Sequence, residues 1–149
     1  FVGNMLTMYI FADNVEDGLG HGRLLGFYLL CGLGALATHL LFNPDSTVPV
    51  VGASGAIAGV MGAYMRFYPH AKVVTLIPII IIPWIVELPA VIFLGFSFMT
   101  QLFAGAADWF ARDGAQGVAW WAHVGGFILG MFLGPLFRNP RLCEFCLRV

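Results

Sequence analysis

Ser54 and His123 are the two residues whose side chains could perform covalent chemistry together. A serine hydroxyl is a weak nucleophile at neutral pH, and it becomes a strong one when an adjacent base takes its proton. A neutral imidazole is the usual base. The two residues are far apart in the sequence, so this chemistry depends on elements that bring them together.

The composition indicates that most of the chain lies in lipid. Of its 149 residues, 60% are hydrophobic and only 10% are charged, whereas soluble domains have roughly 45–50% apolar and about 25% charged residues. A soluble domain of this length could not bury so much apolar surface. The net charge of −1, without a cluster of Lys and Arg, excludes an electrostatic nucleic-acid partner.

The apolar segments predict an all-α polytopic membrane bundle, because a spanning helix needs about 20 mostly apolar residues. Between the third and fourth spans, the segment 73–84 contains Pro78 and Pro83, and we expect it to be irregular or interfacial. We expect one domain over 1–149 that begins inside a membrane segment, lacks an N-terminal part, and ends in a cytoplasmic tail at 138–149. The five predicted spans, the first of them truncated, are 1–11, 24–42, 50–68, 87–103 and 118–137.

The distribution of basic residues predicts the orientation of these spans, because cytoplasmic loops carry an excess of Lys and Arg. Six of the seven basic residues fall on one side of the membrane, which is therefore predicted to be cytoplasmic, and Arg112 alone falls on the opposite side. Asn4, Ser54 and His123 then lie near the outer ends of three spans. Polar groups in a bilayer are costly unless they pair or line a wet cavity. We therefore expect a polar site that opens toward the extracytoplasmic side. The basic residues on the predicted cytoplasmic side are Arg23, Arg66, Lys72, Arg138, Arg141 and Arg148.

Glycines on two of the predicted spans provide a reason for Ser54 and His123 to meet. One helix face carries Gly55, Gly59 and Gly62, and a second stripe that follows His123 contains Gly126 and Gly130. Faces of small residues let two membrane helices approach closely. If these two faces pack together, both side chains lie near the top of the contact.

The residues around these positions resemble those of rhomboid intramembrane serine proteases over essentially the whole chain. The segment Gly52-Ala53-Ser54-Gly55 resembles the fourth transmembrane helix of that family, and Gly3-Asn4-Met5 resembles its second. The run Ala122-His123-Val124-Gly125-Gly126-Phe127-Ile128-Leu129-Gly130 resembles its sixth helix.

The resemblance implies an intramembrane serine endopeptidase that cleaves transmembrane segments of other membrane proteins without a metal or cofactor. Ser54 would be the nucleophile and His123 the base, with no acidic third member. Asn4 and Gly52 would support the oxyanion site together with the Ser54 backbone N–H. The identity of the substrate and the oligomeric state stay open.

Two departures from the family pattern concern the surroundings of the pair. The family has a His four residues before the Asn, a position that would precede Phe1. Some relatives have a Tyr four residues after the Ser, which stacks on the catalytic His. Ala58 stands there in this chain. Another group, such as Trp120, Trp121 or a loop residue, is then expected to hold the imidazole.

Two other classes of function remain open at this stage. A rhomboid-like protein without catalysis could bind membrane clients, although both Ser54 and His123 are present. A small transporter or channel is expected to have paired charges or broken helices at mid-membrane, and the apolar segments here carry almost no charge.

The remaining polar and cysteine residues are expected to be structural. His39 is expected to be interfacial or hydrogen-bonded, and Glu16 and Arg23 to pair within their turn or tie it to a neighbouring helix. Cys31 is expected to be a buried small hydrophobe. A single C-x-x-C, Cys143 to Cys146, is weak evidence for zinc or redox chemistry.

Overall fold

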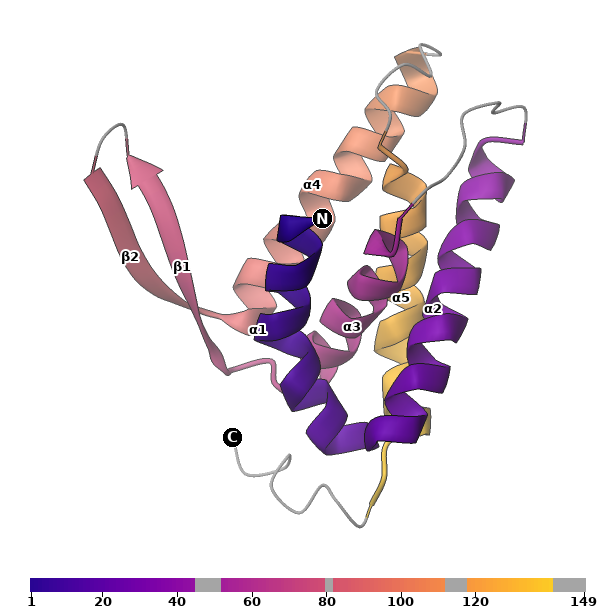
Figure 1. Ribbon diagram of the computed structural model, residues 1–149. Helices are drawn as coiled ribbons and strands as arrows, with labels where there is room; N and C mark the ends of the chain where they lie inside the picture. Colours follow the sequence, from indigo (N-terminus) through magenta and orange to yellow (C-terminus); the bar gives the residue numbers. More distant parts are fainter. Residues whose placement is uncertain (45–51, 80–81, 112–117, 141–149) are drawn as a thin grey trace.

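The computed structural model describes residues 1–44, 52–79, 82–111 and 118–140, which form a bundle of five α-helices with a two-stranded β-hairpin beside it (Figure 1). The predicted helical membrane bundle is confirmed. Predictions for Arg112, Arg141, Arg148, Cys143 and Cys146 fall outside the described residues. In chain order the elements are α1 (Val2–Leu19), α2 (His21–Phe42), α3 (Ser54–Phe67), β1 (Lys72–Ile79), β2 (Ile82–Pro89), α4 (Ala90–Ala111) and α5 (Trp120–Phe137).

Three helices, α2, α4 and α5, are long and apolar enough to cross a bilayer. Their outward faces are apolar; on α2, for example, Leu25, Leu29 and Leu33 are exposed. Side chains of this kind are stable on the outside of a bundle only where the surrounding solvent is itself apolar. These exposed faces are therefore the lipid-contacting surface of a multi-pass membrane protein.

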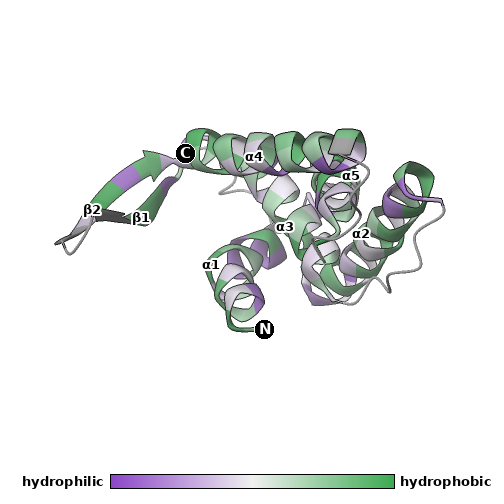
Figure 2. Ribbon diagram, turned by 90° about the horizontal axis from the view of Figure 1, so that it is seen from above, coloured by the Kyte–Doolittle hydropathy of each residue, from purple (hydrophilic) through white to green (hydrophobic). Residues whose placement is uncertain are grey.

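Helix α3 lies in the centre of the bundle, between α1, α2, α4 and α5 (Figure 2). It has only 14 residues, so it is about 21 Å long, against about 33 Å for the 22-residue α2. Because α3 is short, its N-terminal end lies below the upper ends of α2 and α4 (Figure 1).

Contact between α3 and α5 is made by backbone against backbone. A Cβ atom added at Gly126 would collide with the carbonyl of Gly55, and one at Gly130 would collide with the carbonyl of Gly59. In the other direction, a Cβ at Gly62 would collide with the carbonyl of Phe127. No residue larger than glycine fits these positions without moving a helix.

Helix α2 packs against the same glycine-bearing part of α3. Cys31 is fully buried, as predicted, and its side chain lies where a Cβ of Gly59 would be. Ala35 of α2 likewise lies against Gly55. The glycines of α3 therefore allow two neighbouring helices, α5 and α2, to pack closely against it.

The predicted boundary at the end of the first span is wrong, since α1 continues to Leu19 instead of ending at residue 11. The chain reverses at Gly20, whose φ of 87° is a conformation that glycine adopts without steric strain. Arg23 does not pair with Glu16. It donates to the carbonyl oxygens of Phe137 (3.4 Å) and Arg138 (3.1 Å), which ties this turn to the end of α5.

Glu16 makes its contact within the turn, with a carboxylate oxygen 2.7 Å from His21 Nδ1.

Three further predictions need correction. Residues 52 and 53 precede the helix and α3 begins at Ser54, so the predicted start at residue 50 is wrong. The segment expected to be irregular or interfacial is not irregular, because it forms the antiparallel hairpin of β1 and β2, in which Lys72 faces Pro89 and Ile79 faces Ile82. Its β-branched residues favour strands. The fourth span consequently begins at Ala90 and extends to Ala111 instead of ending at 103.

Gly130→Val tests the backbone contact between α3 and α5. The added side chain must displace the Gly59 carbonyl, so we expect a loss of at least about 1–3 kcal/mol in stability, the usual range for overpacking. The measurement is the thermal unfolding midpoint in detergent. Gly95→Val is the matched control, because a Cβ at Gly95 has no neighbour within 4 Å. Equal midpoints for the two variants would show that the contact is not as close as described.

Candidate active site

Ser54 is the first residue of α3, directly after the N-cap residue Ala53. The first backbone hydrogen bond of the helix runs from the Ile57 N–H to the Ala53 carbonyl, at 3.0 Å. The N–H groups of Ser54, Gly55 and Ala56 therefore have no acceptor within the helix. The side chain of Ser54 is thus placed beside backbone donors at the positive end of a helix dipole.

His123 is the fourth residue of α5, and its Nε2 lies 2.8 Å from the Ser54 Oγ. The contact is partly buried. With Nε2 unprotonated, the serine hydroxyl donates to the ring, which is the arrangement that general-base catalysis requires. Two side chains 69 positions apart are thereby in hydrogen-bonding contact.

The glycine contact described above fixes this distance. Gly55, the residue after Ser54, approaches the backbone carbonyl of Ala122, the residue before His123. One turn further along α5, Gly126 lies against the Gly55 carbonyl. Because the backbones touch at Gly55, the residue next to Ser54, the short serine side chain reaches the imidazole.

Trp120 lies against the imidazole, whereas Ala58 has no aromatic ring to offer. The Trp120 and His123 ring centroids are 6.2 Å apart with an interplanar angle of 89°, an edge-to-face contact. A Cβ added at Gly105 of α4 would lie 3.2 Å from the Trp120 Cβ. This glycine leaves space for both tryptophans, since the same Cβ would lie 3.3 Å from the Trp121 ring. The Trp121 ring also stacks on Phe42, with centroids 4.0 Å apart.

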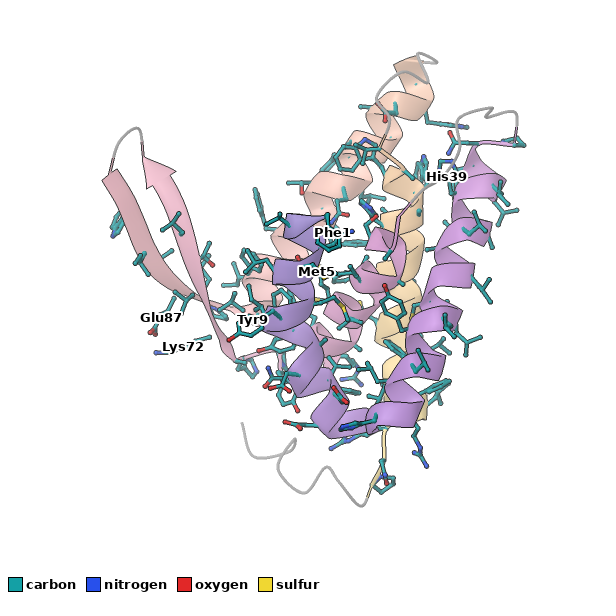
Figure 3. All side chains as sticks on the ribbon, in the orientation of Figure 1. Phe1, Met5, Tyr9, His39, Lys72 and Glu87 are labelled. Atoms are coloured by element: carbon teal, nitrogen blue, oxygen red, sulfur yellow. The ribbon has the colours of Figure 1, made fainter. Side chains whose placement is uncertain are left out.

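Asn4 is the third residue of α1, and it is half-buried. Within the described part of the chain, its amide makes no hydrogen bond to Ser54 or His123. Phe1 and Met5, which lie on either side of Asn4 in the sequence, are level with the N-terminal end of α3 (Figure 3). Since α1 packs against α3, Asn4 lies on a helix that neighbours the helix of Ser54.

Gly52 has a φ of 133°, in the region that favours glycine. Only Ala53 separates it from the start of α3. A Cβ placed on it would lie 3.8 Å from the Ser54 Oγ. Gly52 therefore allows the chain to enter the helix close to the hydroxyl without covering it.

Comparison with known proteins now decides the family. The family model described as the Rhomboid domain matches residues 1–140. The chain belongs to the rhomboid family. It is 26% identical over 136 residues to "Rhomboid protein 1, mitochondrial" of Saccharomyces cerevisiae, an alignment that covers 88% of this chain and 36% of the yeast protein. The chain thus spans about a third of that relative's length. No solved structure matches.

Sequence reasoning about this rhomboid domain missed the role of Gly105 and left the choice between Trp120 and Trp121 open. A glycine on an apolar helix gives no signal about which side chain it admits. Another unforeseen feature is a group of buried ring nitrogens near the C-terminal end of α2 and the N-terminal end of α5. Among the described residues, the Nε1 atoms of both tryptophans and the Nδ1 of His39 have no hydrogen-bond partner. Figure 3 shows His39 near the upper end of α2.

The described residues contain no group of three or more His, Cys, Asp or Glu side chains that could hold a metal ion.

Proposed function

We propose that this rhomboid-family chain is an intramembrane serine endopeptidase that cleaves transmembrane segments of other membrane proteins with Ser54 and His123. The observation that carries the proposal is the 2.8 Å contact between Ser54 Oγ and His123 Nε2. Membership of the rhomboid family supports the same reaction class.

In the first half of the proposed reaction, the Ser54 oxygen attacks the carbonyl carbon of the scissile peptide bond while Nε2 of His123 accepts the hydroxyl proton. The resulting tetrahedral intermediate collapses when the imidazolium gives this proton to the leaving amine. The product is an acyl-enzyme ester on Ser54. A water molecule then attacks the ester, with the imidazole again serving as base and then as acid.

Negative charge develops on the substrate's carbonyl oxygen during both attacks. The unpaired N–H groups in the first turn of α3 point toward this region, and the helix dipole favours an anion there. Asn4 would add a side-chain donor when substrate is bound, because it lies in the first turn of α1, which packs against α3. Gly52 would leave the approach to the oxyanion open.

The active site would open toward the extracytoplasmic side of the membrane. Arg23 and Arg138 lie together at one end of the bundle, and Arg66 is in the last turn of α3. Ser54 begins α3 at the opposite end. With the basic end in the cytoplasm, water would reach the recessed N-terminus of α3 from outside.

Fluorophosphonate labelling tests the proposed chemistry, because the probe reacts only with an activated serine. We expect the protein in detergent to be labelled, Ser54→Ala to lose labelling completely, and His123→Ala to react about 10²–10⁴ times more slowly. Ser97→Ala, which removes a serine from α4, serves as the control and keeps the wild-type rate. Equal labelling of wild type and Ser54→Ala would contradict the protease and favour a client-binding protein without catalysis.

Trp120→Leu tests whether the indole positions the imidazole. Aromatic pairs contribute about 0.5–1.5 kcal/mol, so we expect labelling of Ser54 to slow by about 2- to 10-fold. Trp120→Phe retains an aromatic edge and should keep most of the rate. The matched control is Trp109→Leu, since Trp109 is exposed on α4. If Trp120→Leu and Trp109→Leu react equally fast, Trp120 does not hold the ring.

Asn4→Ala tests the proposed amide donor. Loss of one oxyanion donor typically costs about 10²–10³ in rate, so kcat for a transmembrane substrate should fall by that factor while KM changes little. Thr7→Ala is the control on the same helix, because the Thr7 hydroxyl donates within α1 to the Gly3 carbonyl. An unchanged kcat in Asn4→Ala would remove Asn4 from the mechanism.

A further inference from the structure

The β-hairpin is joined firmly to the bundle at its base. The Ala90 N–H donates to the Ala71 carbonyl at 2.8 Å, and the Val91 N–H donates to the Pro69 carbonyl at 2.9 Å. Val73 is 6% exposed and belongs to the hydrophobic core. Strand β2 ends at Pro89 and α4 begins at Ala90, so no linker separates hairpin from helix.

Beyond this base, the hairpin exposes apolar side chains on both faces. Val74, Leu76 and Ile85 share one face by strand alternation and are 67%, 60% and 63% exposed. Trp84, on the other face, is 60% exposed. In water these side chains would leave a contiguous apolar patch of the kind that soluble surfaces avoid.

Charge on the described part of the hairpin is confined to its base. Lys72 Nζ lies 2.8 Å from Glu87 Oε2, so the two charged groups pair with each other. Their hydrogen bond raises the pKa of Lys72 and lowers the pKa of Glu87, which keeps both groups ionised. The hairpin is therefore charged where it leaves the bundle and apolar further along the strands.

The direction of the hairpin decides what surrounds these side chains. It leaves the bundle near the end where α3 stops and then rises while extending away from the helices (Figures 1 and 2). Viewed from above, it extends outward from the N-terminal end of α4 and is largely hydrophobic (Figure 2). It thus occupies the same layer as the helices whose outer faces contact lipid.

We propose that the hairpin is a membrane anchor whose apolar faces contact phospholipid acyl chains in the leaflet at the basic end of the bundle. The Lys72–Glu87 pair would lie among the headgroups, and Leu76, Trp84 and Ile85 would lie among the chains. The lipid contact of α4 then continues onto the hairpin without interruption. The hairpin in this way fixes the height of the N-terminal end of α4.

Unpaired strand edges limit how deep the hairpin sits, because open N–H and C=O groups are costly in hydrocarbon. Pro78 faces Pro83 in the ladder, and a proline within an edge strand removes an outward N–H. The remaining edge groups need water or headgroups as partners. The faces of the hairpin can therefore contact acyl chains only while its strand edges reach water or headgroups.

Spin-label accessibility in vesicles tests the anchor. The protein carries Cys143→Ser and Cys146→Ser, while Cys31 is kept because it is fully buried. A nitroxide is attached at Leu76→Cys or Ile85→Cys in phosphatidylcholine and phosphatidylglycerol vesicles, and its collisions with oxygen and with a water-soluble nickel chelate are measured. Leu33→Cys on α2 is the lipid reference, and His70→Cys in the exposed loop is the aqueous reference.

We expect both hairpin labels to show the oxygen-to-nickel ratio of the Leu33 label, several-fold above that of the His70 label. A ratio like that of His70 would place the hairpin in water and overturn the anchor. Low collision rates with both reagents would overturn it as well, because they would mean that protein, such as a second copy of the chain, covers the strands. Circular dichroism of each labelled variant checks that the helices are intact, and agreement between two label positions guards against local disturbance.

Discussion

The close approach of the α3 and α5 backbones is the constraint on which the rest of the structure depends. Lipid offers no hydrophobic force that would hold two apolar helices together, so their contact relies on close packing. Gly126 against the Gly55 carbonyl and Gly130 against the Gly59 carbonyl supply that packing. The same contact sets the distance between Ser54 and His123, because each lies within one turn of it. Stability of the bundle and geometry of the site therefore have one cause.

A second consequence follows from the length of α3. A helix of 14 residues cannot reach both faces of the bilayer, and its N-terminal end is recessed below α2 and α4. Backbone N–H groups that would be costly in lipid are thereby collected at one point beside Ser54. The arrangement is tolerable only if water or a substrate carbonyl supplies acceptors there, which links the fold to the proposed hydrolysis of peptide bonds.

Much of this could be read from the sequence because it depends on residue type and spacing. Apolar length predicted the membrane helices, and glycine spacing on two of them predicted that Ser54 and His123 would meet. The hairpin escaped prediction because a run of β-branched residues broken by Pro78 and Pro83 fits an irregular segment equally well. The start of α3 and the space left by Gly105 depend on contacts between helices, which no local pattern contains.

Cleavage of a transmembrane substrate by the double variant Ser54→Ala/His123→Ala, compared with each single variant, tests the central claim most directly. Groups that act as one catalytic unit show strongly non-additive losses. The account predicts that the double variant retains the same residual rate as Ser54→Ala alone, since His123 has no role without the hydroxyl. If the two single losses multiplied in the double variant, Ser54 and His123 would be acting independently, and the proposed dyad would be wrong.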